Sequence, residues 1–324
     1  MSLFSEKIQK ANGPAENANV SFLEDVIYGL SQDQKTIPPK YFYDAEGSKL
    51  FDQICELDTY YPTRTEMRIL KENTNCIADI IDGHHLIEFG SGSSMKSRIL
   101  LDAAKNLVSY IPVDISKEHL FSCADEVAKE YPKVNVIPIC ADFTKKFDLP
   151  SKLINCNRFG FFPGSTIGNF SPEQAKKFLS MTAKLLGSGG GLLIGVDLKK
   201  DPHTLNAAYN DKEGITAKFN LNLLKRINRE LRGNFMLDDF CHEAYFNQEK
   251  SRIEMHLLSE KDQSVSINGH IFHFSTGESI HTENSYKYSI DEFYKLGKIC
   301  GYKAQQTWTD NQQMFSVHYL SVAK

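Results

Sequence analysis

Five short apolar runs alternate with segments of helical spacing between residues 84 and 197, and this alternation restricts the fold more than any other feature. The runs are apolar throughout, which is typical of strands buried on both faces rather than on one. Strands of this kind that alternate with helices form a parallel sheet covered by helices on both sides. The predicted fold class is therefore α/β, with a doubly wound, mostly parallel sheet. The five runs are 85–90, 108–113, 134–139, 158–162 and 192–196.

The rhythm changes after Asp201-Pro202. Alternating segments at 252–258 and 264–274 predict antiparallel strands with one wet face. A helix at 290–300 and two closing strands, 303–309 and 315–322, then return to the first pattern. We therefore predict a sheet domain interrupted by an insertion, and a second α+β domain built from the N-terminal segment and that insertion. The predicted boundaries are 1–65 and 201–286 for the second domain, and 66–200 and 287–324 for the sheet domain.

Two local patterns give firm expectations. Residues 66–81 carry helical spacing and are predicted to form one helix that ends at Asp82-Gly83. Pro38 and Pro39 are predicted to exclude a helix and to leave an ordered loop rich in aromatic residues. A shorter helix is expected at 21–30, where apolar residues share one face.

Composition narrows the function classes. The 324 residues carry a net charge of -4, which gives no electrostatic reason to follow a nucleic-acid backbone. The seven cysteines include no C-x-x-C pair, so we expect reduced thiols and no metal site. No leader and no membrane span is recognisable. We therefore expect a cytoplasmic monomer that acts on a small molecule, without nucleic-acid or membrane partners.

The residues at the strand ends suggest an adenosine ligand. Gly90-Ser91-Gly92 follows the first run, and such glycines let a ligand approach the backbone closely. Asp114 ends the second run, where an acid can hold a ribose diol. Asp142 and Phe143 follow the third, where an acid and an aromatic ring suit adenine. The alternative is that Asp114 and Asp142 only cap the next helices.

With these motifs, the chain resembles the histidine-specific Nα-methyltransferases of ergothioneine biosynthesis, from Pro38 to the last strand. The segments that carry the resemblance are Pro38-Pro39-Lys40-Tyr41-Phe42-Tyr43-Asp44, Tyr60-Tyr61-Pro62-Thr63-Arg64, Glu88-Phe89-Gly90-Ser91-Gly92-Ser93-Ser94 with Lys96, Pro112-Val113-Asp114, Gly164-Ser165-Thr166-Ile167-Gly168-Asn169, Gly195-Val196-Asp197-Leu198, Ala207-Ala208-Tyr209, Arg252-Ile253-Glu254-Met255 and Ile280-His281-Thr282-Glu283-Asn284-Ser285.

The resemblance implies a class I methyltransferase sheet that binds S-adenosylmethionine and a second domain that binds substrate. It implies N-methylation of the α-amino group of L-histidine, up to the trimethylated betaine hercynine. The implied cofactor residues are Tyr43, Gly90, Lys96, Asp114, Asp142 and Phe143. The implied substrate residues are Tyr60, Asn169, Tyr209, Met255, Glu283 and Ser285.

Methyl transfer from a sulfonium needs a neutral amine held in line with the methyl group, and no covalent enzyme intermediate. Tyr43 is expected to be the catalytic hydroxyl, which orients the amine or relays its proton. Glu283 and Ser285 alternate on an expected strand, so they face the same side and suit the donor and acceptor of an imidazole.

For several of these residues a purely structural role is the alternative. Tyr43 could simply pack, Asn169 could form a turn, Glu283 could be a solvated acid and Met255 could fill a core. Rival functions are methylation of another amine, such as a tryptophan-like or thiol-histidine substrate, and non-catalytic binding of an adenosyl ligand.

Overall fold

An eight-stranded sheet contains the five apolar runs. The computed structural model describes residues 16–150, 153 and 156–323; residues 1–15, which the sequence assigns to the second domain, lie outside the described part. The strand order is β13-β14-β7-β6-β2-β3-β4. The eighth strand, β5, pairs with the end of β3, whereas β4 pairs with its beginning. The strands are β2 (His85–Phe89), β3 (Ser109–Asp114), β4 (Asn135–Val136), β5 (Ile139–Cys140), β6 (Arg158–Phe162), β7 (Gly191–Asp197), β13 (Tyr302–Thr309) and β14 (Phe315–Val322).

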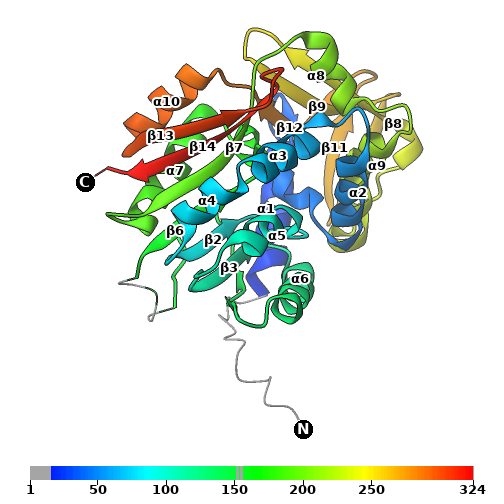
Figure 1. Ribbon diagram of the computed structural model, residues 1–324. Coiled ribbons are helices and arrows are strands. Elements are labelled where there is room, and N and C mark those ends of the chain that lie inside the picture. Colours follow the sequence, from blue (N-terminus) through cyan, green and yellow to red (C-terminus); the bar gives the residue numbers. More distant parts are fainter. Residues whose placement is uncertain (1–15, 151–152, 154–155, 324) are drawn as a thin grey trace. The chain divides into compact units, whose positions relative to one another are not determined.

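Strands β2 to β7 pair in parallel, whereas β14 runs antiparallel to both β7 and β13. In Figure 1 the red strand β14 lies beside the green strand β7, although the two are far apart in the sequence. This order confirms the predicted α/β class with a mostly parallel, doubly wound sheet. It brings the turns that follow β2, β3 and β5 to one edge of the sheet.

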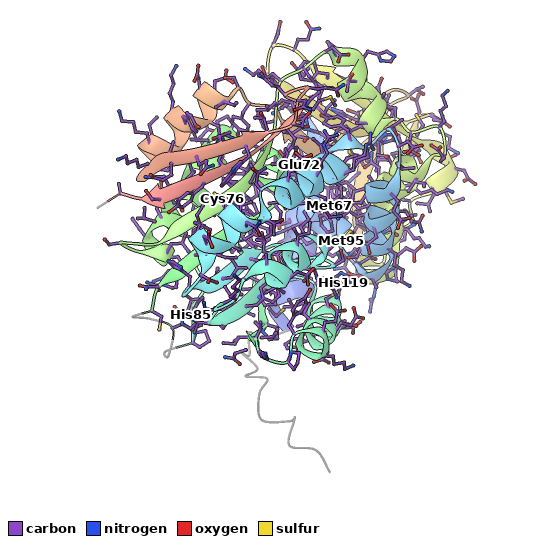
Figure 2. All side chains as sticks on the ribbon, viewed as in Figure 1. Met67, Glu72, Cys76, His85, Met95 and His119 are labelled. Atoms are coloured by element: carbon purple, nitrogen blue, oxygen red, sulfur yellow. The ribbon has the colours of Figure 1, made fainter. Side chains whose placement is uncertain are left out.

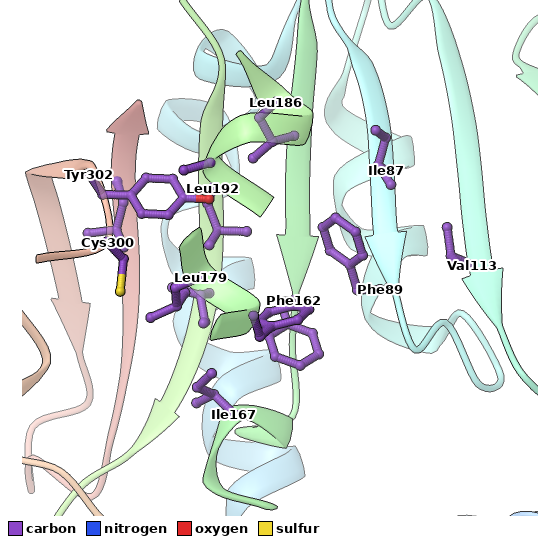
Figure 3. Packing of buried hydrophobic residues seen from close by; sticks show 14 of the residues in the cluster. Ile87, Phe89, Val113, Phe162, Ile167, Leu179, Leu186, Leu192, Cys300 and Tyr302 are labelled. Carbon is purple, nitrogen blue, oxygen red and sulfur yellow. The ribbon is translucent and has the colours of Figure 1, made fainter. Parts of the chain in front are cut away.

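Two separate layers of apolar side chains cover the faces of this sheet. On one face, helices α3 to α6 pack over Leu86, Tyr110 and Phe159. On the other face, α7 and α10 cover Ile87 and Phe89, as Figure 3 shows for the side chains around Phe162 and Leu179. The helices are α3 (Tyr61–Glu72), α4 (Thr74–Ile81), α5 (Met95–Ala103), α6 (Lys117–Glu130), α7 (Pro172–Leu186) and α10 (Ile290–Ile299).

The sequence predicted two of these elements wrongly. The single helix expected at 66–81 is divided at Asn73, whose backbone leaves the helical conformation between α3 and α4. The single strand expected at 134–139 is two short pieces, β4 and β5, which pair with different parts of β3. Apolar periodicity continues across both breaks, so it could not locate them.

Contacts between Cα atoms divide the chain into two compact units. Unit 1 contains Pro62–Lys199 and Lys287–Lys324, and therefore the whole eight-stranded sheet. Unit 2 contains Pro14–Tyr61 and Lys200–Tyr286. No helix among the described residues is both long enough and apolar enough to cross a membrane.

Unit 2 is built on a four-stranded sheet of order β1-β12-β9-β8. Its strands are β1 (Lys35–Thr36), β8 (Phe240–Asn247), β9 (Arg252–Ser259) and β12 (Ser279–Tyr286), and a separate hairpin is formed by β10 (Gln263–Ile267) and β11 (His270–Phe274). The parallel pairing of β1 with β12 joins the early segment of the chain to the late one. The helical elements are α1 (Glu16–Leu30), η1 (Pro39–Phe42), α2 (Ala45–Glu56), α8 (Pro202–Tyr209) and α9 (Ile215–Leu231).

The prediction that Pro38 and Pro39 exclude a helix is wrong. Pro39 begins the short 3-10 helix η1 and Pro38 is its N-cap, although the sequence predicted that this pair excludes a helix. The first residues of a helix make no internal bond through their N–H groups, so proline is tolerated there.

The stretch 264–274, expected as one alternating segment, is a hairpin of two strands. The turn between them contains Asn268, which has a positive φ of 47°, and Gly269.

Candidate functional site

The turn after β2 is shaped by its glycines. Gly90 and Gly92 have positive φ angles of 71° and 47°, a conformation that L side chains rarely adopt. The Gly90 amide donates to the Val113 carbonyl at 2.8 Å, and the Gly92 amide lies 3.2 Å from Asp114 Oδ2. The turn is thereby tied to the end of β3, where the sequence placed the ribose acid.

Phe143 lies against this turn from the loop after β5. A Cβ atom added to Gly90 would stand 3.3 Å from the Phe143 ring, so glycine permits the close approach. Asp114 also accepts the Ser116 amide at 2.9 Å, and Asp142 accepts the Thr144 amide at 3.0 Å. Both acids thus make the local turn contacts that the capping alternative expects, and their roles toward a ligand stay predictions.

Lys96, near the start of α5, is held by a residue that the sequence reasoning missed. Met95, labelled in Figure 2, begins the helix that carries it. Lys96 Nζ lies 2.5 Å from a carboxylate oxygen of Glu66, which is completely buried on α3. The Gly164 amide donates to the same carboxylate at 2.8 Å. Glu66 lies on α3 and Lys96 on α5, with α4 and β2 between them in the sequence, so no local pattern indicates this contact and only the fold reveals it.

Glu88, the last acid of β2 before the glycine turn, is also buried. Burial raises the pKa of Glu88 to about 7, although the nearby hydroxyls of Ser97 and Tyr110 and the charge of Lys96 oppose the rise. The Tyr110 hydroxyl donates to Glu88 and lies 2.9 Å from Ser94 Oγ. This polar cluster supports the glycine turn from the α3–α6 face of the sheet.

These features fit an adenosyl cofactor. Among the described residues, Ser91 Oγ is buried in the glycine turn without a hydrogen-bond partner. Buried polar atoms normally have a hydrogen-bond partner. A buried hydroxyl that has none, next to glycines whose backbone a ligand can approach, is therefore suited to bind a ligand. The turn, the acid Asp114 and the ring of Phe143 supply groups for a ribose and an adenine.

Unit 2 gathers aromatic rings in a row. Tyr43 meets Phe51 edge-on with ring centroids 5.6 Å apart, Phe51 meets Tyr60 at 6.4 Å, and Tyr60 meets Tyr209 at 6.0 Å. Tyr43 also packs at 5.9 Å against Phe219 of α9, so the packing role considered for it is real. Burial, with added repulsion from Tyr209, Cys55, Glu283 and Tyr43, raises the pKa of Tyr60 well above its ordinary value, which keeps its hydroxyl protonated.

The row of rings ends on strand β12. The Tyr209 hydroxyl donates to Ser285 Oγ at 2.8 Å. Glu283 pairs directly with Met255 of β9, and Ser285 pairs with Ile253. Since these partners are two residues apart on β9, Glu283 and Ser285 lie on the same face, as the sequence predicted. Glu283 is only 9% exposed, so the solvated-acid reading is wrong.

The structure therefore brings five of the six predicted substrate residues together in unit 2: Tyr60, Tyr209, Met255, Glu283 and Ser285. The sixth, Asn169, belongs to unit 1, where it ends the short helix η3 (Thr166–Asn169) after β6. Tyr43, assigned to both cofactor and catalysis, belongs to unit 2. The roles of Asn169 and Tyr43 stay predictions, as do those of the five.

The opposite face of the same sheet carries a cluster of potential metal ligands. The ligand atoms of Glu254, His256 and His281 lie within 4.8 Å of one another. The two imidazoles stack at 4.7 Å with an interplanar angle of 13°, so their in-plane lone pairs run nearly parallel rather than toward one ion. Arg252 also lies 2.6 Å from the Glu254 carboxylate. These contacts favour a hydrogen-bonded layer over a metal centre.

A sheet of this order with a glycine turn at its edge fits the class of S-adenosylmethionine-dependent methyltransferases. The model of a family described as "Histidine-specific methyltransferase, SAM-dependent" matches residues 22–322. Histidine N-alpha-methyltransferase of Mycolicibacterium smegmatis is 39% identical over 91% of this chain and 93% of its own length. The protein of the same name from Mycobacterium tuberculosis is 37% identical over 96% and 98%.

The chain thus belongs to the family of histidine-specific, S-adenosylmethionine-dependent methyltransferases. Ergothioneine biosynthesis protein 1 of Neurospora crassa is 30% identical over 90% of this chain, which spans one third (33%) of that longer protein.

Proposed function

We propose that this enzyme transfers methyl groups from S-adenosylmethionine to the α-amino group of L-histidine, up to the trimethylated betaine hercynine, in ergothioneine biosynthesis. The observation that carries the proposal is the shared buried face of Glu283 and Ser285 on β12. A carboxylate accepts the N–H of an imidazole and a hydroxyl can donate to its other nitrogen. The names of the relatives from Mycolicibacterium and Mycobacterium agree with this substrate.

The same pair disfavours a tryptophan-like acceptor. An indole has one N–H donor and no ring acceptor, so the Ser285 hydroxyl would lose its partner on the ring. Leaving a buried polar group unpaired costs about 1–3 kcal/mol, enough to discriminate between two amino acids. Ser285 is 4% exposed, and water is therefore a poor substitute for the missing ring nitrogen.

The chain's own residues orient the acceptor amine and accept its proton, and they form no covalent intermediate with the substrate. S-adenosylmethionine supplies an electrophilic methyl group when it is bound. The acceptor amine must lose its proton before it reacts, and an α-amino group titrates near pH 8. A tyrosine hydroxyl can hold such an amine and pass its proton on, and Tyr43 is the proposed residue. The aromatic row beside it offers ring faces that attract a cationic, partly methylated nitrogen.

Mass spectrometry of reaction products tests the proposal. Purified enzyme is incubated with S-adenosylmethionine and, separately, L-histidine, L-tryptophan, a thiol-histidine derivative and L-phenylalanine, which is the control because its ring has no nitrogen. We expect methylated histidine, with up to three methyl groups on the α-nitrogen, and no product from phenylalanine. Products from tryptophan or the thiol derivative but not from histidine would contradict the substrate assignment.

A further inference from the structure

Strand β12 carries an irregularity at the residue before Glu283. The register pairs His281 with His256 and Glu283 with Met255, so Thr282 is an extra residue that bulges out of the ladder. In a regular strand His281 and Glu283 would share a face, because side chains alternate. The bulge instead leaves His281 on the face of the stacked imidazoles and turns Glu283 to the opposite, buried face. One extra residue thus decides where the carboxylate stands.

The bulge is held by a buried amide on α9. Thr282 is 1% exposed, and its hydroxyl lies 2.8 Å from Asn220 Oδ1 and 3.1 Å from the Met255 carbonyl. Asn220 is completely buried, and its Nδ2 lies 2.9 Å from both the His256 carbonyl and His242 Nδ1. A buried amide inside a helix is costly unless its donors and acceptor are all bonded, and here they are.

The contacts continue from Asn220 to the aromatic row. Because burial lowers the pKa of His242, its imidazole is neutral at neutral pH. Its Nδ1 accepts from Asn220, so the proton is on Nε2, which donates to the Tyr209 carbonyl at 2.9 Å. The Tyr209 hydroxyl then donates to Ser285. The chain of bonds begins and ends on β12, at residues on either side of Glu283.

We propose that Asn220 and Thr282 are positioning residues which lock the bulge and thereby fix Glu283 and Ser285 in the geometry that selects the acceptor's ring. This inference rests on the proposed function for the identity of the ring, but the lock itself does not. Neither residue was singled out as a ligand by the sequence, since a threonine in a strand and an asparagine in a helix carry no special pattern.

The variant Thr282→Val removes the hydroxyl and keeps the branched shape, while Thr282→Ser keeps the hydroxyl. The matched control is Thr182→Val in unit 1, which removes an equally buried hydroxyl that bonds Tyr302 at 2.9 Å. All three are measured for hydrogen exchange of the peptide spanning 279–286 and for KM, kcat and cofactor KM. Where Thr282→Val folds poorly, Thr282→Ala takes its place with the same expected results, since it also removes the hydroxyl that bonds Asn220 and needs less space.

For Thr282→Val we expect faster exchange in β12 and about a tenfold higher KM for histidine, the scale of one buried hydrogen bond, with an unchanged cofactor KM. Thr282→Ser and Thr182→Val are expected to keep the native exchange rate in β12 and the native KM for histidine. A lower melting temperature with native exchange in β12 and a native KM would overturn the inference and leave only a structural role. Faster exchange in an enzyme that does not methylate histidine would instead overturn the proposed substrate while preserving the lock.

Discussion

Lys96 and Glu66 form an ion pair in which the carboxylate is completely buried and the lysine is partly exposed, with 2.5 Å between nitrogen and oxygen. The carboxylate also accepts the Gly164 amide. It lies so close to Gly195 that an added Cβ would stand 2.0 Å from Glu66 Oε1. One acid therefore ties α3, α5 and the loop after β6 together, and it fixes the direction in which Lys96 extends.

Replacing Glu66 with glutamine is expected to weaken cofactor binding by about 1–3 kcal/mol, because the proposed cofactor lysine loses the charge that orients it. Calorimetric titration with S-adenosylhomocysteine measures the effect. Glu130→Gln is the matched control. It removes the charge of an exposed acid on α6 that lies 2.7 Å from Arg98, and Arg98 is on the same helix, α5, as Lys96. Equal affinities for the two variants would refute an orienting role for Glu66.

Asp114→Ala should also reduce affinity for S-adenosylhomocysteine, by about 1–3 kcal/mol, through the loss of bonds to the ribose and of the Gly92 contact that shapes the turn. Asp125→Ala, an exposed acid of α6, serves as the control. If cofactor affinity survives the loss of Asp114, that residue only caps the next helix, and the ribose assignment is wrong.

Glu283→Ala is expected to weaken histidine binding by about 1–3 kcal/mol in the presence of S-adenosylhomocysteine, because a buried carboxylate no longer accepts the imidazole N–H. The matched control is Glu243→Ala, an exposed acid on β8 that pairs with His256 and so lies on the opposite face of the sheet. Unaltered histidine affinity in the Glu283 variant would remove the imidazole assignment.

The stacked imidazoles predict a dependence of stability on pH. Burial, helped by the nearby His256, lowers the pKa of His281 from 6.5 to about 4. Between those values the unfolded chain binds a proton that the folded chain does not, so the free energy of unfolding falls as pH falls from 6.5 toward 4. The full shift corresponds to on the order of 3 kcal/mol.

Chemical denaturation at a series of pH values tests this. His281→Phe keeps a ring against His256 but cannot titrate, so we expect a smaller loss of stability between pH 6.5 and 4. Part of the slope remains, because burial also lowers the pKa of His256. His270→Phe, at an exposed position of β11, should leave the slope as it is. An unchanged slope in the His281 variant would contradict a neutral buried imidazole.

The sequence by itself determined the sheet of unit 1 and the residues at its strand ends. Burial on both faces is written into each strand as a continuous apolar run, so β2, β3, β6 and β7 could be placed without any knowledge of their neighbours. The same local pattern put Glu283 and Ser285 on one side of a strand. It failed at Pro38 and Pro39, where proline is compatible with the first turn of the 3-10 helix.

Only the tertiary structure decided which face Glu283 occupies and what holds Lys96. The first depends on a bulge secured by Asn220, 62 residues away from Thr282 in the sequence. The second depends on Glu66, whose other partner Gly164 is 98 residues distant. Buried polar groups find partners wherever the packed chain brings them, and no local periodicity records that choice.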